Sequence, residues 1–161
     1  MTNTQEELKQ LVEHAINDFN DHDTYLISRD LSERCICSKF AMYLEKFVSD
    51  SRFRDYHVDV EYNRGAKGNE YRPKNIGDKR IVVDLIVHKR GYNPELGFNN
   101  LICIEMKKSN DKRGFSQDEE RLKLMTISSS TFCYRMGFLI VADMKKHKLK
   151  IQEKFHTDYD F

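Results

Sequence analysis

The chain has 161 residues, of which 39% are hydrophobic and 33% are charged. This length allows one domain with a substantial core, and the composition excludes an intrinsically disordered chain. The formal net charge is only +1, so overall charge does not indicate a nucleic-acid-binding protein, and local clusters must provide any such function.

The N-terminus, MTNTQEELKQ, has neither the basic region nor the apolar stretch of a secretion signal. No apolar run reaches the roughly 20 residues that a membrane helix needs. We therefore expect a cytoplasmic protein with no membrane partner. The cysteines have no CxxC spacing, which predicts buried free thiols and argues against a zinc site; they are Cys35, Cys37, Cys103 and Cys133.

Two amphipathic helices are predicted at the start of the chain. In the first, over residues 1–20, Thr4 and Glu7 have the spacing of a capping box. The second is expected to begin near Asp30 or Ser32 and to continue to about residue 48, because apolar residues recur there at helical spacing. Glu33 lies one turn before this apolar stripe, so a carboxylate is expected at the start of the buried helical face.

Three strands are expected next. Residues 56–62 alternate in polarity, as in a half-exposed strand, and the glycine-rich segment 63–79 predicts a loop or an irregular hairpin. The run IVVDLIV, residues 81–87, is typical of a central strand covered on both faces, and Asp84 is its only charge. The third strand is NLICIEMKKS, in which Glu105 and Lys107 are two residues apart and therefore share a face.

The last third of the chain predicts one helix and two strands. Ser116 and Glu119 have capping-box spacing and predict a helix to about residue 127. GFLIVA, residues 137–142, predicts a short buried strand, and residues 149–155 predict a basic edge strand. The order α-α-β-β-β-α-β-β indicates a single α/β domain of the α+β type over 1–161, with a mixed central sheet flanked by helices.

Three acidic residues and one lysine are in unusual places for charged groups. Asp84 and Glu105 interrupt apolar strands, and Glu33 lies on a buried helical face. An unpaired carboxylate costs several kcal/mol in an apolar interior, so three of them suggest a shared cation. Magnesium fits best, because it binds one or two carboxylates together with water and phosphate oxygens. Lys107 would then lie beside the metal-bound water.

This pattern resembles the PD-(D/E)XK nuclease superfamily, the restriction-endonuclease-like enzymes. The similarity is carried by Asp84 followed by Glu105-Met106-Lys107, by Glu33 in LSERCICSKFAMYLEKF, and by DEERLKLM in the helix after the ExK strand. The stretch DLIVHKRG looks like small bacterial members of unassigned function. The resemblance covers about residues 30–145 and implies an αβββαβ core, with the helix over 1–20 as an addition. The proline that usually precedes the aspartate is Val83 here.

The resemblance implies a Mg2+-dependent nuclease that hydrolyses phosphodiester bonds of DNA, with RNA as an alternative substrate and Mn2+ able to substitute. Asp84 and Glu105 would bind the metal, Glu33 would support the metal site, and Lys107 would position or activate the attacking water. A homodimer is an option, because cutting both strands needs two sites. The alternative is a catalytically silent module of the same fold that binds nucleic acid or a protein assembly.

Ordinary structural roles compete with each of these functional ones. Glu105 and Lys107 could form a plain ion pair at a strand end, and Glu33 would stabilise its helix through the macrodipole. Glu61 is an auxiliary ligand candidate on a neighbouring strand, where solvated charge is the simpler explanation. His88 is an auxiliary candidate for phosphate contact or proton transfer, against a hydrogen-bonded structural histidine.

Basic residues after the ExK strand are candidate nucleic-acid contacts, because they would neutralise phosphates and release counterions. They are Lys108, Lys112 and Arg113. Charge runs of this kind are also common on solvated faces. The sequence contains no readable base-recognition element, so it predicts no sequence specificity.

Overall fold

The structure of the protein is a computed structural model. It describes residues 3–61, 81–91, 99–127 and 132–157 with their side chains, and the backbone alone of residues 65–67, 70–72, 75–76 and 79–80. The sequence from Arg90 to Asn100 is rich in turn-forming residues, and most of this segment lies outside the described residues.

The described elements follow the predicted order, with one short helix added. The helices are α1 (Thr4–His22), α2 (Tyr25–Ser28), α3 (Glu33–Ser49) and α4 (Phe115–Thr126). The main strands are β1 (His57–Val60), β6 (Leu85–His88), β7 (Asn100–Lys108), β8 (Met136–Asp143) and β9 (Lys148–His156). Four shorter strands, β2 (Gly65–Lys67), β3 (Glu70–Arg72), β4 (Asn75–Ile76) and β5 (Lys79–Arg80), form two antiparallel pairs in the predicted hairpin region.

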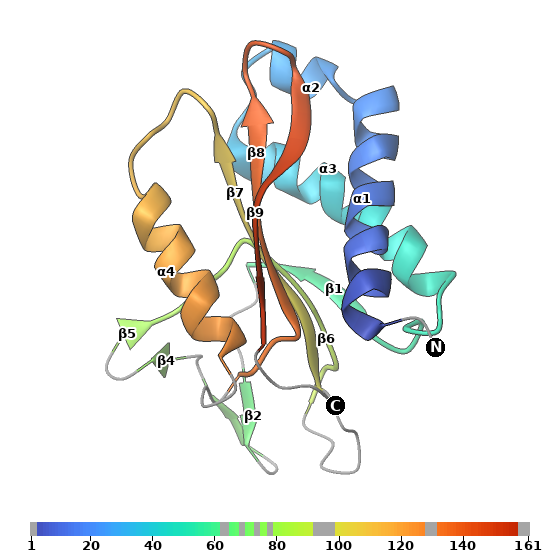
Figure 1. The fold of residues 1–161 in the computed structure, drawn as a ribbon, viewed down its shortest axis with the longest axis vertical. Helices are drawn as coiled ribbons and strands as arrows, with labels where there is room; N and C mark the ends of the chain where they lie inside the picture. The colour runs from blue at the N-terminus through green and yellow to red at the C-terminus, as the bar shows by residue number, and fades with distance from the viewer. Residues whose placement is uncertain are drawn as a thin grey trace.

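The main sheet is mixed and has the strand order β1-β6-β7-β8-β9. Strands β7 and β8 are parallel, and the other neighbouring pairs are antiparallel. Helices α1 and α3 cover one face of the sheet, and α4 covers the other (Figure 1). The predicted α+β class, with a mixed sheet between helices, is therefore confirmed. The prediction that the last strand is an edge strand is also correct.

The central strand β7 separates two apolar cores because its side chains alternate between the faces. Ile102, Ile104 and Met106 belong to the larger core, which packs against α1 and α3. Cys103 belongs to the smaller core, which packs against α4. Glu105 follows Cys103 by two residues and therefore points to the α4 side, away from the larger core.

Helix α1 begins differently from the predicted capping box. Its N-cap is Asn3, whose side chain accepts a hydrogen bond from the backbone N–H of Gln5. Thr4 and Glu7 instead accept hydrogen bonds from the guanidinium of Arg52, which lies just after the end of α3. The tertiary contact with Arg52 therefore uses the two side chains that the local sequence pattern assigns to capping. Helix α3 begins after an N-cap at Ser32, as predicted.

Helix α4 also begins before its predicted cap. Its N-cap is Gly114, with φ of 79°, and no side chain caps the helix. A residue other than glycine would be strained at this φ. A Cβ at Gly114 would lie 3.6 Å from Nζ of Lys107, so the start of α4 passes close to the ExK lysine. The Ser116 capping box is therefore wrong, because a left-handed turn against β7 sets the start of the helix.

The aspartate predicted within a strand lies at a bend. Strand β6 begins at Leu85, and residues 81–83 are not part of the sheet. Ile81 and Val83 still enter the smaller core beside α4, whereas Asp84 lies where the chain turns into the sheet. The strand predicted over residues 81–87 thus begins only at Leu85. Asp84 lies at the bend before it, so the regular alternation of a strand does not fix the direction of its side chain.

Two further expectations concern the membrane and the cysteines. No helix in the described part of the chain is both long and apolar enough to span a membrane. All four cysteines are free, and Cys37 and Cys103 are buried, but Cys35 is exposed on α3 and Cys133 is only partly buried. The expectation of buried thiols is therefore correct for two of the four.

Candidate active site

Acidic residues that belong to or flank three neighbouring strands meet at one place in the sheet. Val60 pairs with Leu85, and Leu85 pairs with Ile104. Continuing this register by one residue sets Asp84 opposite both Glu61 and Glu105. A backbone hydrogen bond of 2.9 Å from Glu61 to the carbonyl of Asp84 supports this alignment.

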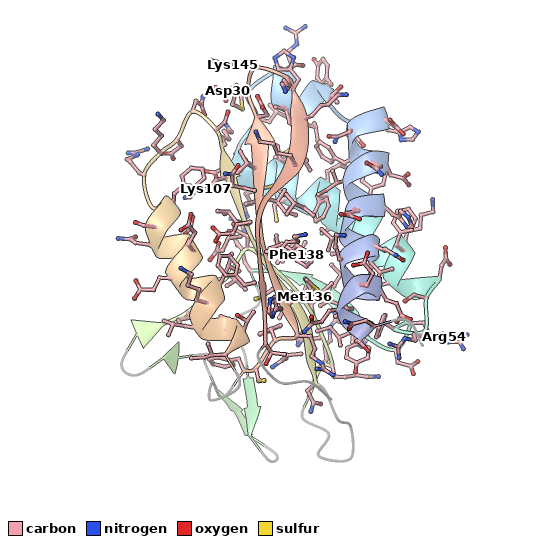
Figure 2. All side chains as sticks on the ribbon, in the orientation of Figure 1. Asp30, Arg54, Lys107, Met136, Phe138 and Lys145 are labelled. Carbon is pink, nitrogen blue, oxygen red and sulfur yellow. The ribbon has the colours of Figure 1, made fainter. Side chains whose placement is uncertain are left out.

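These residues line a pocket of about 340 Å³ between the start of α3, the ends of the strands and helix α4. The lining is mostly polar. It consists of Glu33, Arg34, Cys37, Val60, Glu61, Val82, Asp84, Glu105, Met106, Lys107, Asp118 and Arg121. All four residues that the sequence pattern assigns to catalysis, Glu33, Asp84, Glu105 and Lys107, are among them. Figure 2 shows Lys107 on the side of the sheet that carries α4.

Asp84 and Glu105 form a carboxyl pair at the base of the pocket. Their side chains share a hydrogen bond, and the backbone N–H of Met106 donates a second one of 2.7 Å to Oδ2 of Asp84. Burial and the charge of Asp84 together raise the pKa of Glu105 to about 9. Burial also raises the pKa of Asp84, against the effect of its two hydrogen bonds. In the protein without metal, Glu105 therefore keeps its proton at neutral pH and donates it to Asp84.

The buried proton of Glu105 predicts an unusual pH dependence of stability. The folded protein holds a proton that the unfolded chain releases above about pH 4. In the presence of a chelator, the free energy of unfolding is expected to fall by about 2–3 kcal/mol between about pH 6 and pH 8. The Glu105→Gln variant should lack this fall. Denaturant titrations of both proteins at several pH values test it, and parallel curves would contradict the assignment of the proton to Glu105.

Lys107 is held in the pocket by helix α4. Its Nζ lies 3.3 Å from Oδ2 of Asp118, a side chain that is only 4% exposed. Burial of Lys107 opposes its charge, but Asp118 and Glu33 outweigh this and raise the pKa of the lysine. Lys107 is therefore a protonated cation beside the carboxyl pair, suited to stabilising negative charge on a phosphate.

Arg121 is the second cation at this end of the pocket. Its Nε lies 2.8 Å from Oε1 of Glu105, and its Nη2 contacts Oδ1 of Asp118 one turn earlier on α4. Asp118 thus connects Lys107 and Arg121. Residues of α4 thus contact both side chains of the ExK pair: Arg121 contacts Glu105, and Asp118 contacts Lys107.

Glu33 enters from the other side, at the first turn of α3. Burial raises its pKa, and Lys107 lowers it in part. The carboxylate also accepts a hydrogen bond from the backbone of Lys108. Lys107 and Asp84 are therefore close enough to Glu33 to shift its pKa. The helical spacing of the apolar residues in α3 predicts this position of Glu33 at the start of the buried face.

The two auxiliary candidates have different positions. Glu61 lines the pocket, with φ of 51°, and its carboxylate pairs with Arg34 at 2.9 Å. His88 does not line it. Its Nε2 lies 2.8 Å from Asp59, which also pairs with Arg90. His88 does not share the site of Asp84, because it lies at the far end of β6, four residues further along the chain, where it pairs with Asp59. A hydrogen-bonded structural histidine is the role that fits these contacts.

The three candidate nucleic-acid contacts follow the pocket along the chain. Lys108 pairs with Asp30 at 2.8 Å, and Arg113 pairs with Asp111 at 3.1 Å. Lys112 is exposed in the same turn. None of the three is among the residues that line the pocket. Lys108 is the last residue of β7, directly after Lys107, and Lys112 and Arg113 follow in the turn before α4.

Asp118 and Arg121 are the site residues that sequence reasoning missed, although both lie in the DEERLKLM stretch. A signal for Asp118 was present. It shares a helical face with Leu122 and Met125, and all three are buried. A carboxylate on an apolar helical stripe is the same kind of anomaly as Glu33. No comparable signal marked Arg121, because an arginine among surface charges is ordinary.

The donor set of the pocket is compatible with magnesium bound by two carboxylates. Among the described residues, no group of three or more His, Cys, Asp or Glu side chains could hold a metal ion. Glu33 therefore does not complete a three-ligand set with Asp84 and Glu105. Magnesium commonly takes only one or two carboxylates and completes its shell with water and phosphate. Oε1 of Glu105 is buried and accepts no hydrogen bond within the described chain, which leaves it available to a cation.

Comparisons with known proteins give no independent guide to this pocket. No family model matches the chain, and neither a curated protein nor a solved structure shows significant similarity to it. Function must therefore be inferred from the residues of the pocket and their chemistry.

Proposed function

We propose that the protein is a Mg2+-dependent nuclease of the PD-(D/E)XK kind that hydrolyses phosphodiester bonds of DNA. The observation that carries this proposal is the meeting of Asp84, Glu105 and Lys107 on one face of the sheet, in one pocket. The proposed core is α3-β1-β6-β7-α4-β8, which has the αβββαβ order of these nucleases. The helix α1 would then be an addition to that core.

Each residue has a defined part in the proposed reaction. A bound magnesium ion would lower the pKa of a water molecule and polarise the scissile phosphate. Asp84 and Glu105 would hold this ion, and Glu105 would lose its proton on doing so, because metal ligands must be deprotonated. Lys107, kept charged by Asp118 and Glu33, would orient the attacking water or stabilise the charge that develops on the phosphate. Glu33 would bind water on the open side of the site.

Nicking of supercoiled plasmid DNA in the presence of Mg2+ tests the proposal. Wild-type protein should nick the plasmid, and a chelator should abolish the activity. The Asp84→Asn variant should lose both nicking and binding of Mn2+ measured by calorimetry, since it removes one of two metal-binding carboxylates. Asp59→Asn is a matched control outside the pocket and should cut. If wild type and Asp84→Asn cut equally well, the proposed site is wrong.

A second candidate function is a catalytically silent module of the same fold. It is favoured by the internal pairing of the pocket, where Arg121 already contacts Glu105 and Lys107 already pairs with Asp118. Such a module would bind nucleic acid or a protein without a metal. Titration with Mn2+ separates the two candidates: heat that Asp84→Asn abolishes supports the nuclease, and DNA binding that is independent of metal supports the module.

A further inference from the structure

The contact between Arg121 and Glu105 is close but is not a hydrogen bond. Nε of Arg121 and Oε1 of Glu105 are 2.8 Å apart, and both atoms are buried. Neither makes a hydrogen bond within the described part of the chain. Arginine–carboxylate pairs normally gain both energy and fixed geometry from parallel hydrogen bonds. Arg121 therefore lies against Glu105 without being tied to it by hydrogen-bond geometry.

Asp118 gives Arg121 a second anchor that does not depend on Glu105. The two residues are three positions apart on α4, where side chains are neighbours, and Nη2 of Arg121 contacts Oδ1 of Asp118. The arginine side chain is still 37% exposed, whereas that of Glu105 is 4% exposed. The guanidinium can thus leave Glu105 and remain at the pocket, with part of its surface open to an incoming ligand.

A metal ion bound by the carboxyl pair would lie close to the guanidinium of Arg121. The described residues of the lining include five acidic and three cationic side chains. The carboxylates are Glu33, Glu61, Asp84, Glu105 and Asp118, and the cations are Arg34, Lys107 and Arg121. A divalent ion on Asp84 and Glu105 would repel a guanidinium 2.8 Å from the same carboxylate.

We propose that Arg121 is a phosphate-binding residue of the substrate site. It lies against Glu105 in the protein without metal, and it turns to a phosphate oxygen of the DNA when a divalent cation binds the carboxyl pair. The planar guanidinium suits this role because it can bind two phosphate oxygens at once. This inference rests on the nuclease function proposed above, and it assigns a substrate contact to a residue outside the D-ExK pattern.

The test compares Arg121→Gln with Lys123→Gln, which removes the same charge from an exposed position on the same helix. In Arg121→Gln, calorimetry should show Mn2+ binding that is tighter by on the order of tenfold, because a positive charge beside the ion is gone. The KM for DNA cleavage by the same variant should rise by about tenfold, because a phosphate contact is lost. Lys123→Gln should change neither quantity. A purely structural arginine would not give tighter metal binding together with weaker substrate binding.

A conservative variant separates the charge of Arg121 from its shape. Arg121→Lys should bind Mn2+ as wild type does but should still have a raised KM, since an ammonium cannot make the two-pronged contact. Thermal unfolding checks that each variant is folded. If Arg121→Gln does not fold, the KM of Arg121→Lys tests the proposed phosphate contact. Weaker Mn2+ binding in Arg121→Gln, or an unchanged KM in both variants, would overturn the proposed role of Arg121. The nuclease proposal would still stand in that case if the wild-type protein cleaves DNA. Absence of Mn2+ binding in wild type would overturn both.

Discussion

Replacing Lys107 by alanine is expected to lower kcat for Mg2+-dependent DNA cleavage by at least about 100-fold. Among the described residues that line the pocket, Lys107 is the only lysine, and it lies 3.3 Å from Asp118 and on the same strand face as Glu105. The variant should still bind Mn2+, because an ammonium is not a metal ligand. Single-turnover cleavage and Mn2+ calorimetry on the same preparation measure the two effects separately.

The matched control is Lys108→Ala, the next residue of β7. Its side chain pairs with Asp30 and does not line the pocket. As a candidate phosphate contact, Lys108 should affect KM and its dependence on salt, and leave kcat within about threefold of wild type. A loss of kcat in Lys108→Ala as large as that in Lys107→Ala would show that the strand as a whole is sensitive. The specific role of Lys107 would then be withdrawn.

The largest expected loss of stability comes from replacing Phe138 by alanine. Phe138 has no exposed surface and lies on β8, where it faces the larger core between the sheet and helices α1 and α3 (Figure 2). Removing the ring loses its transfer free energy and leaves a cavity that the surrounding sheet can close only in part. The free energy of unfolding should fall by about 3–5 kcal/mol. Urea denaturation followed by circular dichroism measures this loss.

The control for this core substitution is Met42→Ala on α3. Met42 is 61% exposed, so the change should alter stability by no more than about 0.5 kcal/mol. A loss below about 1 kcal/mol in Phe138→Ala would mean that the core on the α1 side collapses around the missing ring. The larger apolar cluster would then not be packed as described.

Much of the fold is encoded locally and was predictable. Apolar residues recur every three to four positions in a helix and every second position in a strand, so the periodicity of a short segment reveals its structure. The α3 helix and the strand β9 were found in this way, and continuous apolar runs marked the buried strands β7 and β8. The same periodicity placed Glu105 and Lys107 on a common face before any partner was known.

Capping and pairing were less predictable because distant residues compete for local groups. Thr4 and Glu7 have the spacing of a capping box, but Arg52 takes their side chains and Asn3 caps the helix. His88 was considered for the site of Asp84, yet it pairs with Asp59 on the neighbouring strand β1. In each case the sequence shows which groups need a partner and does not show which partner is nearest.

The sequence by itself determined the order of the elements and marked Asp84, Glu105 and Glu33 as carboxylates in apolar surroundings. The pairing of the strands then decided that Asp84 stands opposite Glu105, and the packing of α4 brought Asp118 and Arg121 to the ExK pair. Strand register and helix packing depend on contacts between residues far apart in the chain, which no local periodicity specifies. The proton on Glu105 depends on the burial of this side chain and on the neighbouring charge of Asp84, both of which the tertiary structure sets.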